Sequence, residues 1–280
     1  MKIITSIEEQ KEYCSSIEAE GNNISLIPTM GNLHSGHESL LLLSRSTKNK
    51  RIVSLFVNPL QFDSISDYRS YPSSIDSDIE ILERNKVDCL FMPDENQMIE
   101  NINHPETIHL PQYMSILCGK HRKGHFDGVF KIVKKLFKII NPSIAYFGKK
   151  DYQQLMMVRH IAKEYFGNRI EIVAGDTVRE SNGLAMSSRN NRLSLTDKKI
   201  ASSVHKELII MRESINLGSN NQELLKKSID ALSDKYIKIE YLELLSSVDF
   251  SIISKKNADN AMLFVAFYIS GVRLIDNIDV

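Results

Sequence analysis

Short apolar segments alternate with longer amphipathic ones as far as residue 173, and this alternation constrains the fold more than any other feature of the chain. The apolar segments have the length of β-strands and lie at residues 24–27, 52–56, 89–91, 144–147 and 170–173. The helical patterns between them lie at residues 36–48, 73–86, 124–140 and 153–166. Such repetition is typical of a parallel sheet with helices on both faces. The sequence therefore predicts a doubly wound α/β domain whose ligands bind beyond the carboxyl ends of its strands.

The pattern changes after residue 192. Two amphipathic helices are predicted at residues 195–216 and 221–235, and three strands at residues 237–244, 261–269 and 272–276. Helices followed by strands are typical of an α+β unit. We therefore expect two domains, residues 1–179 and residues 180–280.

Composition restricts the class of protein. The chain has 280 residues, and Lys+Arg and Asp+Glu both total 35, so no net charge attracts it to nucleic acid or to an anionic membrane. No apolar run approaches the roughly 18 residues that a membrane span needs, and the first residues lack the shape of a signal peptide. The three cysteines are far apart in sequence, which argues against disulfides and against a cysteine zinc site. We expect a cytoplasmic protein that binds neither nucleic acid nor membrane.

Two histidines follow the first predicted strand, three residues apart and with Gly36 between them. His34 and His37 stand where a helix begins, and a helix N-terminus with free N–H groups attracts anions such as phosphate. Two imidazoles there can donate hydrogen bonds to a phosphate whose charge grows during reaction. Without its context, the pattern fits equally well a Gly-rich turn with one solvated and one core histidine.

Polar residues also follow the second and fourth predicted strands. Asn58 and Gln61 offer neutral amides that suit a hydroxy acid, although Asn58 could simply cap a turn while Gln61 is exposed. Gly148 permits close approach of a nucleotide, and Asp151 can accept from ribose hydroxyls or cap a helix.

Two further segments carry cations. Arg122 lies in a basic, Gly-punctuated loop that is either a phosphate clamp or a solvated cationic loop. Ser187, Ser188 and Arg189 lie at the domain boundary, where we expect few contacts to hold them. They would form a mobile phosphate clamp, or else an ordinary linker.

Taken in order, these segments resemble the pantoate–β-alanine ligase (pantothenate synthetase) family. Its His-x-Gly-His turn is shared with other nucleotidyltransferases. The matching stretches are residues 28–37, 57–62, 124–126, 145–154, 178–179, 183–190 and 273–277. The resemblance implies a Rossmann-like domain with a smaller C-terminal lid domain, in a homodimer. It also implies a ligase that uses ATP and Mg²⁺. Pantoate is first converted to pantoyl adenylate with release of pyrophosphate, and the amine of β-alanine then displaces AMP.

The resemblance also assigns residues. It implies catalytic roles for His37 (the family's proton donor), His34, Lys150 and Arg189. It implies nucleotide contacts from Met30, Gly31, Asn32, Leu33, His34, Ser35, Gly36, His37, Gly148, Lys149, Lys150, Asp151, Val178, Met186, Ser187, Ser188 and Arg189. It implies substrate contacts from Gln61, Gln154, Asn58 and Arg122. It leaves the protein ligands of Mg²⁺ unassigned.

Two residues depart from the family pattern, and two other functions stay open. Lys149 stands where the family usually has Glu, and Lys123 stands where it usually has Pro. An adenylyltransferase acting on a phosphate acceptor would share the histidine turn but would not need Gln61 and Gln154. A non-catalytic nucleotide-binding regulator on the same fold would be expected to lack one of the four catalytic side chains. The size and the zero net charge argue against a tRNA synthetase.

Overall fold

The chain forms two compact units, Met1–Asp176 and Thr177–Val280. The structure is a computed structural model that describes residues 1–100, 109–233, 236–253 and 260–280. The first unit therefore ends a few residues before the boundary expected from the sequence. None of the described helices combines the length and the apolar character that a bilayer span requires.

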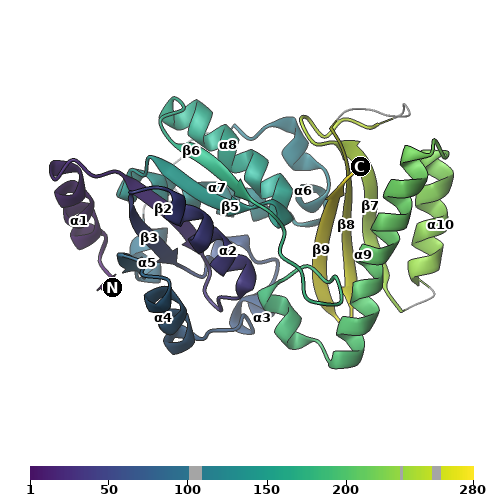
Figure 1. The fold of residues 1–280 in the computed structure, drawn as a ribbon, viewed down its shortest axis with the longest axis horizontal. Coiled ribbons are helices and arrows are strands. Elements are labelled where there is room, and N and C mark those ends of the chain that lie inside the picture. Colours follow the sequence, from purple (N-terminus) through teal and green to yellow (C-terminus); the bar gives the residue numbers. More distant parts are fainter. Residues whose placement is uncertain (101–108, 234–235, 254–259) are drawn as a thin grey trace. The chain divides into compact units, whose positions relative to one another are not determined.

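The first unit is built on a six-stranded sheet in which every pair of neighbouring strands is parallel (Figure 1). Its strands are β1 (Lys2–Ile4), β2 (Ile24–Thr29), β3 (Lys50–Leu55), β4 (Cys89–Phe91), β5 (Ile144–Gly148) and β6 (Glu171–Gly175). The spatial order is β1-β4-β3-β2-β5-β6. From the centre outward, β2 is followed by β3, β4 and β1 on one side, and β5 is followed by β6 on the other. The carboxyl ends of β2 and β5 therefore flank the switch point at which such sheets bind ligands.

Helices cover both faces of this sheet, as crossover connections between parallel strands require. They are α1 (Ile7–Ala19), α2 (Ser35–Leu43), α3 (Ile65–Arg69), α4 (Ile75–Arg84), α5 (Glu95–Ile99), α6 (Cys118–His121), α7 (His125–Ile140) and α8 (Tyr152–Phe166). The helix α7 packs against both α1 and α8, whereas α2 packs on β2, β5 and β6. An ion pair of 2.7 Å between Arg84 Nη2 and Glu38 Oε1 joins α4 to α2.

The core explains why the strand predictions succeeded. Every residue of β2 from Ile24 to Ile27 is buried, and Ile52 and Val53 of β3 are completely buried beside it. A strand buried on both faces reads as a continuous apolar run, and these runs are visible in the sequence. The strand β1 and the helix α1 were not predicted. The strand is only three residues long, and the buried face of α1 includes the polar Gln10.

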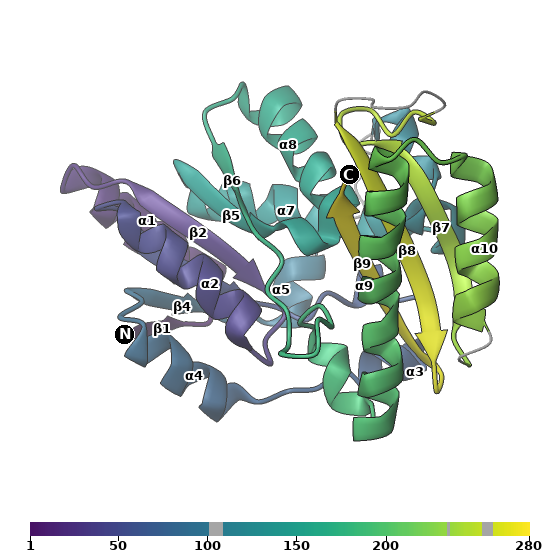
Figure 2. The same cartoon turned by 45° about the vertical axis from the view of Figure 1, so that its right-hand side comes forward.

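The second unit packs two long helices on a three-stranded antiparallel sheet (Figure 2). Its elements are α9 (Leu195–Asn216), α10 (Asn221–Ser233), β7 (Lys238–Ser246), β8 (Ala261–Ile269) and β9 (Val272–Asp279), and β8 lies between the other two strands. The central strand β8 is almost entirely buried, so its side chains contribute to the core of this unit along nearly its whole length. The predicted α+β architecture is confirmed. The last two residues of the predicted helix 221–235, Asp234 and Lys235, lie outside the described residues.

Candidate functional site

The turn between β2 and α2 carries the two histidines, and a buried carboxylate holds it in shape. Gly31 and Asn32 both have positive φ, +79° and +51°, so the turn is one that L-residues adopt reluctantly. Asp78 of α4 is 1% exposed, and its two oxygens accept from the backbone N–H groups of Asn32 (2.8 Å) and Leu33 (2.7 Å). Charge-assisted bonds of this kind are strong, so Asp78 fixes the entry into α2.

The N-terminus of α2 is closed by the histidines themselves. His34 Nδ1 accepts from the backbone N–H of Gly36 (3.1 Å), and His37 Nδ1 accepts from the backbone N–H of His34 (3.2 Å). This is a capping box in which imidazoles take the place of the usual side chains. The free N–H groups expected from the sequence are therefore largely engaged within the protein. A neutral ring that accepts at Nδ1 carries its proton on Nε2, so each imidazole at this turn has its N–H donor at Nε2.

The two rings lie together, with centroids 4.1 Å apart. Burial is the largest cause that lowers the pKa of His34 to about 4 and the pKa of His37 to about 3. The ammonium group of Lys150 lowers both pKa values further, which places its charge at the same site. Near neutral pH both rings are uncharged. Their surroundings favour hydrogen-bond donation from Nε2 over transfer of a proton by a charged His37.

These depressed pKa values predict a pH dependence of stability. Between pH 6.5 and the folded pKa values, the unfolded chain binds protons at residues 34 and 37 that the folded chain does not bind. The contribution of both histidines to the free energy of unfolding is therefore complete above pH 6.5, and it falls as the pH drops toward 4. Urea denaturation at pH 8, 6.5 and 5 measures it. A double variant, His34→Asn with His37→Gln, should lose less stability than the wild type between pH 6.5 and 5. An equal loss would mean that the two rings titrate normally in the folded protein.

The end of β5 leads into the 3₁₀ turn η4 (Lys149–Asp151), which carries the second group of predicted nucleotide contacts. Lys150 Nζ lies 3.6 Å from Asp151 Oδ2. Lys149 Nζ lies 2.6 Å from Asp176 Oδ1, just beyond β6. The charge of Lys149, which departs from the family pattern, is therefore offset by a neighbouring carboxylate rather than simply added to that of Lys150.

Gln61 lies in the 3₁₀ turn η2 (Pro59–Gln61) that follows β3. Its Nε2 contacts the sulfur of Met30 at the end of β2, so the structure brings the two strand ends together. Asn58 is 2% exposed; its Oδ1 accepts from the N–H of Leu60, and its Nδ2 donates to Gln61 Oε1 (3.2 Å) and to the carbonyl of Gly128. Asn58 therefore caps the turn, as in the alternative interpretation, whereas Gln61 is half-buried rather than exposed. Its contacts favour the positioning of Gln61 over direct contact with substrate.

Arg122 is attached to the same turn. Its Nε donates to Asp63 Oδ2 (2.7 Å), its Nη2 to the carbonyl of Gln61 (2.9 Å), and its Nη1 lies 3.2 Å from His125 Nε2. Because a guanidinium only donates, His125 accepts at Nε2, and its Nδ1 donates to the same Gln61 carbonyl (2.8 Å). All three nitrogens of Arg122 are engaged and its side chain is 11% exposed. This favours a positioning role over the substrate contact predicted from the sequence.

A close approach between backbones completes this arrangement. Gly128 of α7 lies directly under the turn, and a Cβ atom at that position would stand 2.3 Å from the carbonyl oxygen of Leu60. Only glycine leaves space for η2 to rest on the helix. The turn that carries Gln61 is thus fixed by Asn58, Arg122 and His125, and by the missing side chain of Gly128.

Two adjacent glutamines on α8 have different roles. Gln153 is buried; its Nε2 donates to the carbonyls of Tyr113 (2.8 Å) and Ile116 (2.9 Å), and its Oε1 accepts from the N–H of Cys118. It is a structural residue that holds the segment before α6. Gln154 is half-buried on the first turn of α8, immediately after η4, and its role as the second substrate amide stays a prediction.

The remaining predicted nucleotide contacts lie in the second unit. Val178 and Met186 pair across a tight hairpin, with the N–H of Met186 donating to the carbonyl of Val178 (2.9 Å). Ser187 caps the 3₁₀ helix η5 (Ser188–Arg192), in which Asn190 is 2% exposed. Ser188 is 7% exposed, so part of the segment 187–189 is buried, and its role as a phosphate clamp stays a prediction. Asn190 Nδ2 donates to Glu180 Oε1 and to the carbonyl of Ala185, which attaches the segment to its own hairpin.

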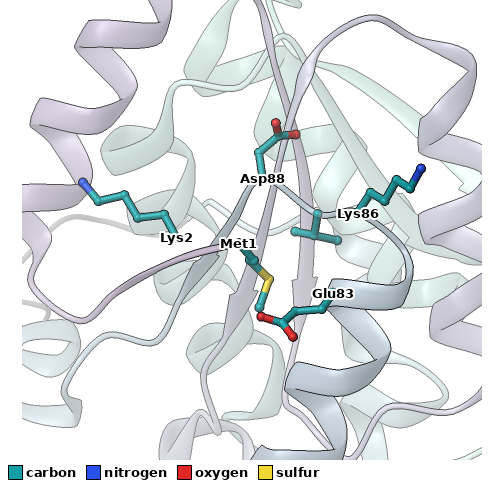
Figure 3. Close-up of a pocket in the computed structure, with 6 residues that line it drawn as sticks. Met1, Lys2, Glu83, Lys86 and Asp88 are labelled. Carbon is teal, nitrogen blue, oxygen red and sulfur yellow. The ribbon is translucent and has the colours of Figure 1, made fainter.

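An open pocket of about 470 Å³ lies at the end of the six-stranded sheet where its strands begin, opposite the carboxyl ends (Figure 3). It is lined by Met1, Lys2, Glu83, Lys86, Val87 and Asp88, next to the first residues of β1 and β4. Because the strands are parallel, this is the amino edge, whereas the histidine turn follows the carboxyl end of β2. The pocket is therefore separate from the candidate site.

Comparison with known proteins identifies the family. The model of the pantoate-beta-alanine ligase family matches residues 2–279. The chain belongs to the pantoate–β-alanine ligase family. A pantothenate synthetase of Caldicellulosiruptor bescii is 39% identical over 280 residues, which cover 99% of this chain and 98% of that protein. The pantothenate synthetase of Bacillus subtilis is 38% identical over 279 residues, which cover 99% and 96%.

Solved pantothenate synthetases have the same fold. The crystal structure of the enzyme from Thermus thermophilus matches with a TM-score of 0.91 at 33% identity, and covers 100% of this chain and 99% of that one. A pantoate–β-alanine ligase from Francisella tularensis, complexed with beta-gamma ATP and β-alanine, matches with a TM-score of 0.84 at 34% identity, covering 100% and 97%. The chain is thus a ligase that joins pantoate to β-alanine.

Sequence reasoning missed several residues that shape the site of this pantoate–β-alanine ligase. Asp78 had a detectable signal, because it lies on the apolar stripe of α4, between Ile75 and Leu82 at helical spacing. His125 lies in the matching stretch 124–126, but its contact with the Gln61 carbonyl was not predicted. Gly128 had no signal beyond its residue type, because its importance comes from the approach of η2, a segment distant in sequence.

Proposed function

We propose that this ligase activates pantoate as an adenylate at the carboxyl edge of its six-stranded sheet, and then transfers the pantoyl group to β-alanine. The observation that carries the proposal is the convergence of three groups at the switch point of the sheet. These are two neutral imidazoles after β2, a neutral amide after β3 and a lysine after β5. Adenylation requires aligned reactants and stabilisation of phosphate charge, and this set supplies both.

The histidine turn and η4 would bind the nucleotide. In the first step an oxygen of the pantoate carboxylate forms a bond to the α-phosphorus of ATP, and the bond to the pyrophosphate oxygen breaks. His34 and His37 would donate from Nε2 to the phosphates, and Lys150 would offset their growing negative charge. Residues 30–36, with Gly148 and Lys149, would line the nucleotide, and Asp151 would accept from the ribose hydroxyls.

The amides of Gln61 and Gln154 would bind pantoate. An amide offers both a donor and an acceptor, so it matches the hydroxyl and carboxylate oxygens of a hydroxy acid. Asn58, Arg122 and His125 hold Gln61 through the contacts described above, and their role in the reaction is therefore indirect. In the second step the β-alanine nitrogen forms a bond to the acyl carbon and loses a proton to water, the bond to the adenylate oxygen breaks, and AMP leaves.

The family resemblance assigns further nucleotide contacts to residues of the second unit. The backbone of Val178 would contact the adenine, Met186 would contact the nucleotide, and Ser187, Ser188 and Arg189 would bind the phosphates. An acyl adenylate hydrolyses when it is exposed to water, so contacts that exclude water also protect the intermediate.

Further assignments follow from the family. Among the described residues, no three His, Cys, Asp or Glu side chains gather into a metal-ligating group. Mg²⁺ would therefore take its ligands mainly from the triphosphate and water, and it would neutralise phosphate charge. Cys14, Cys89 and Cys118 are buried free thiols, which fits a reducing cytoplasm. We propose a homodimer from the family resemblance alone.

Pyrophosphate exchange tests the proposal. Purified protein with ATP, Mg²⁺ and pantoate should incorporate labelled pyrophosphate into ATP in the absence of β-alanine, because the adenylate forms reversibly before the amine is needed. Omitting pantoate should abolish the exchange. A requirement for β-alanine would contradict a separate adenylate intermediate.

A further inference from the structure

One matched motif, the C-terminal segment around Asp276, has no assigned role in the reaction. Asp276 lies on β9 opposite Val265 of β8, and its side chain is 5% exposed. A carboxylate in such a position needs a partner, because an unpaired buried charge is costly. Its charged partner is Arg179, with Nη1 2.6 Å from Oδ2 and Nη2 3.0 Å from Oδ1. Asp276 Oδ1 also accepts from the N–H of Asn277 (2.8 Å), and His205 Nδ1 lies 3.9 Å from Oδ2.

The Arg179 guanidinium also binds backbone on both sides of this ion pair. Its Nη1 donates to the carbonyl of Gly183 (3.2 Å), and its Nη2 donates to the carbonyl of Asn277 (3.3 Å). Gly183 belongs to the hairpin that starts at Val178, whereas Asn277 belongs to β9. One side chain thus attaches the hairpin to β9 through three hydrogen bonds, and a fourth holds the hairpin itself together.

Hydrogen bonds within and from the hairpin connect Arg179 to the residues that are predicted to contact the nucleotide. Arg179 and Ala185 form an antiparallel bridge, and the N–H of Glu180 donates to the carbonyl of Leu184 (2.8 Å). The side chain of Glu180 accepts from Asn190. Gly183 at the tip has φ +95°, and a Cβ there would stand 2.9 Å from the His205 ring of α9. The tip of the hairpin therefore packs tightly against this ring.

We propose that the Arg179–Asp276 pair is a positioning device for the nucleotide contacts of the second unit. It fixes the hairpin, and through the hairpin it fixes the backbone at Val178 and the side chains of Ser187 and Arg189. This inference rests on the proposed function, in which those residues bind ATP. Buried ion pairs add little net stability in general. We therefore assign to this pair the role of fixing the position of the hairpin rather than that of stabilising the unit.

Two conservative variants test the pair. Asp276→Asn keeps the shape and removes the charge, and Arg179→Lys keeps the charge and removes the two-pronged geometry. Each should raise the KM for ATP by about tenfold or more, because small displacements of binding groups are costly. The KM for pantoate should stay within about twofold, since Gln61 and Gln154 lie in the other unit. The double variant should be little worse than either single one, because both lose the same contact.

The second unit contains a matched control pair. Arg273 and Glu240 join β9 to β7 through an ion pair of 2.5 Å, their side chains are 14% and 12% exposed, and their described contacts do not include the hairpin. Glu240→Gln and Arg273→Lys should lower thermal stability comparably without a selective rise in the KM for ATP. Hydrogen exchange at the N–H groups of Glu180 and Met186 should accelerate in Asp276→Asn and not in Glu240→Gln.

Three results would overturn the proposal. They are an unchanged KM for ATP in both Arg179→Lys and Asp276→Asn, an equal rise in the control variants, and faster hairpin exchange with unchanged kinetics. Should one variant fail to fold, the other carries the test. Absence of pyrophosphate exchange in the wild type would refute the proposed function instead, and the exchange rates of the hairpin would still report whether the pair anchors it.

Discussion

Replacing His34 by asparagine is expected to lower kcat by about 10²- to 10³-fold while leaving thermal stability nearly unchanged. Asparagine is a strong helix N-cap, so its Oδ1 can accept the N–H of Gly36 that His34 Nδ1 now accepts. It does not replace the Nε2–H that we assign to the phosphate. Loss of one such electrostatic donor typically costs this much in rate. His37→Gln should behave alike, because glutamine at the third helical position can reach back to the N–H of residue 34.

The alanine variants separate the two roles of each ring. His34→Ala should match His34→Asn in kcat but should unfold more easily, since it loses the cap, which is worth about 1 kcal/mol. Steady-state kinetics, pyrophosphate exchange and thermal melting give the three measurements. Wild-type kcat in the asparagine variant would show that the imidazole serves only as a cap.

Replacing Gly128 by alanine is expected to raise the KM for pantoate by about 10- to 100-fold. The new Cβ would stand 2.3 Å from the carbonyl oxygen of Leu60 and 2.5 Å from its carbon, so the backbone of η2 must move. Gln61 moves with it, and a shift of about 1 Å in a binding group can cost on the order of 100-fold in rate. The KM for ATP should change much less, because His34 and Lys150 lie on other segments.

Stability gives an independent check of Gly128. In an ordinary helical position, Gly→Ala stabilises a protein by up to about 1 kcal/mol. Here the overlap should reverse the sign, with a loss of about 1–3 kcal/mol in the free energy of unfolding. The matched control is Asp127→Ala, at the exposed neighbouring position of the same helix, where little change is expected. A stabilised Gly128→Ala variant with normal kinetics would mean that η2 adapts freely.

The fold was largely predictable because the information lies in local patterns. Strands buried on both faces read as apolar runs, and the alternation with helices determines a parallel sheet. The position of the site followed from the same argument, since polar residues come after β2, β3 and β5. The edge strand β1 has only one buried residue and therefore no apolar run, unlike the equally short but wholly buried β4, and its pairing with β4 depends on a segment almost ninety positions away.

The internal chemistry of the site could not be predicted in the same way. Sequence spacing identified His34 and His37 but not that their Nδ1 atoms close the helix N-terminus. Arg122 was noticed for its charge, yet its contacts to Asp63 and to the Gln61 carbonyl join segments about 60 residues apart. Which hydrogen bonds a polar side chain makes depends on the packing of distant segments, and one sequence does not report that packing.

The contact between Gln61 and Met30 has a consequence for how the site responds to oxidants. A thioether sulfur is a weak acceptor, so in the proposed mechanism pantoate would draw the Gln61 amide away from it at little cost. Met30 is only partly buried. Conversion of its sulfur to the sulfoxide would place a strongly accepting oxygen beside Gln61 Nε2 and would hold the amide against the protein. The oxidation state of one methionine would then determine how readily the enzyme takes up its hydroxy acid.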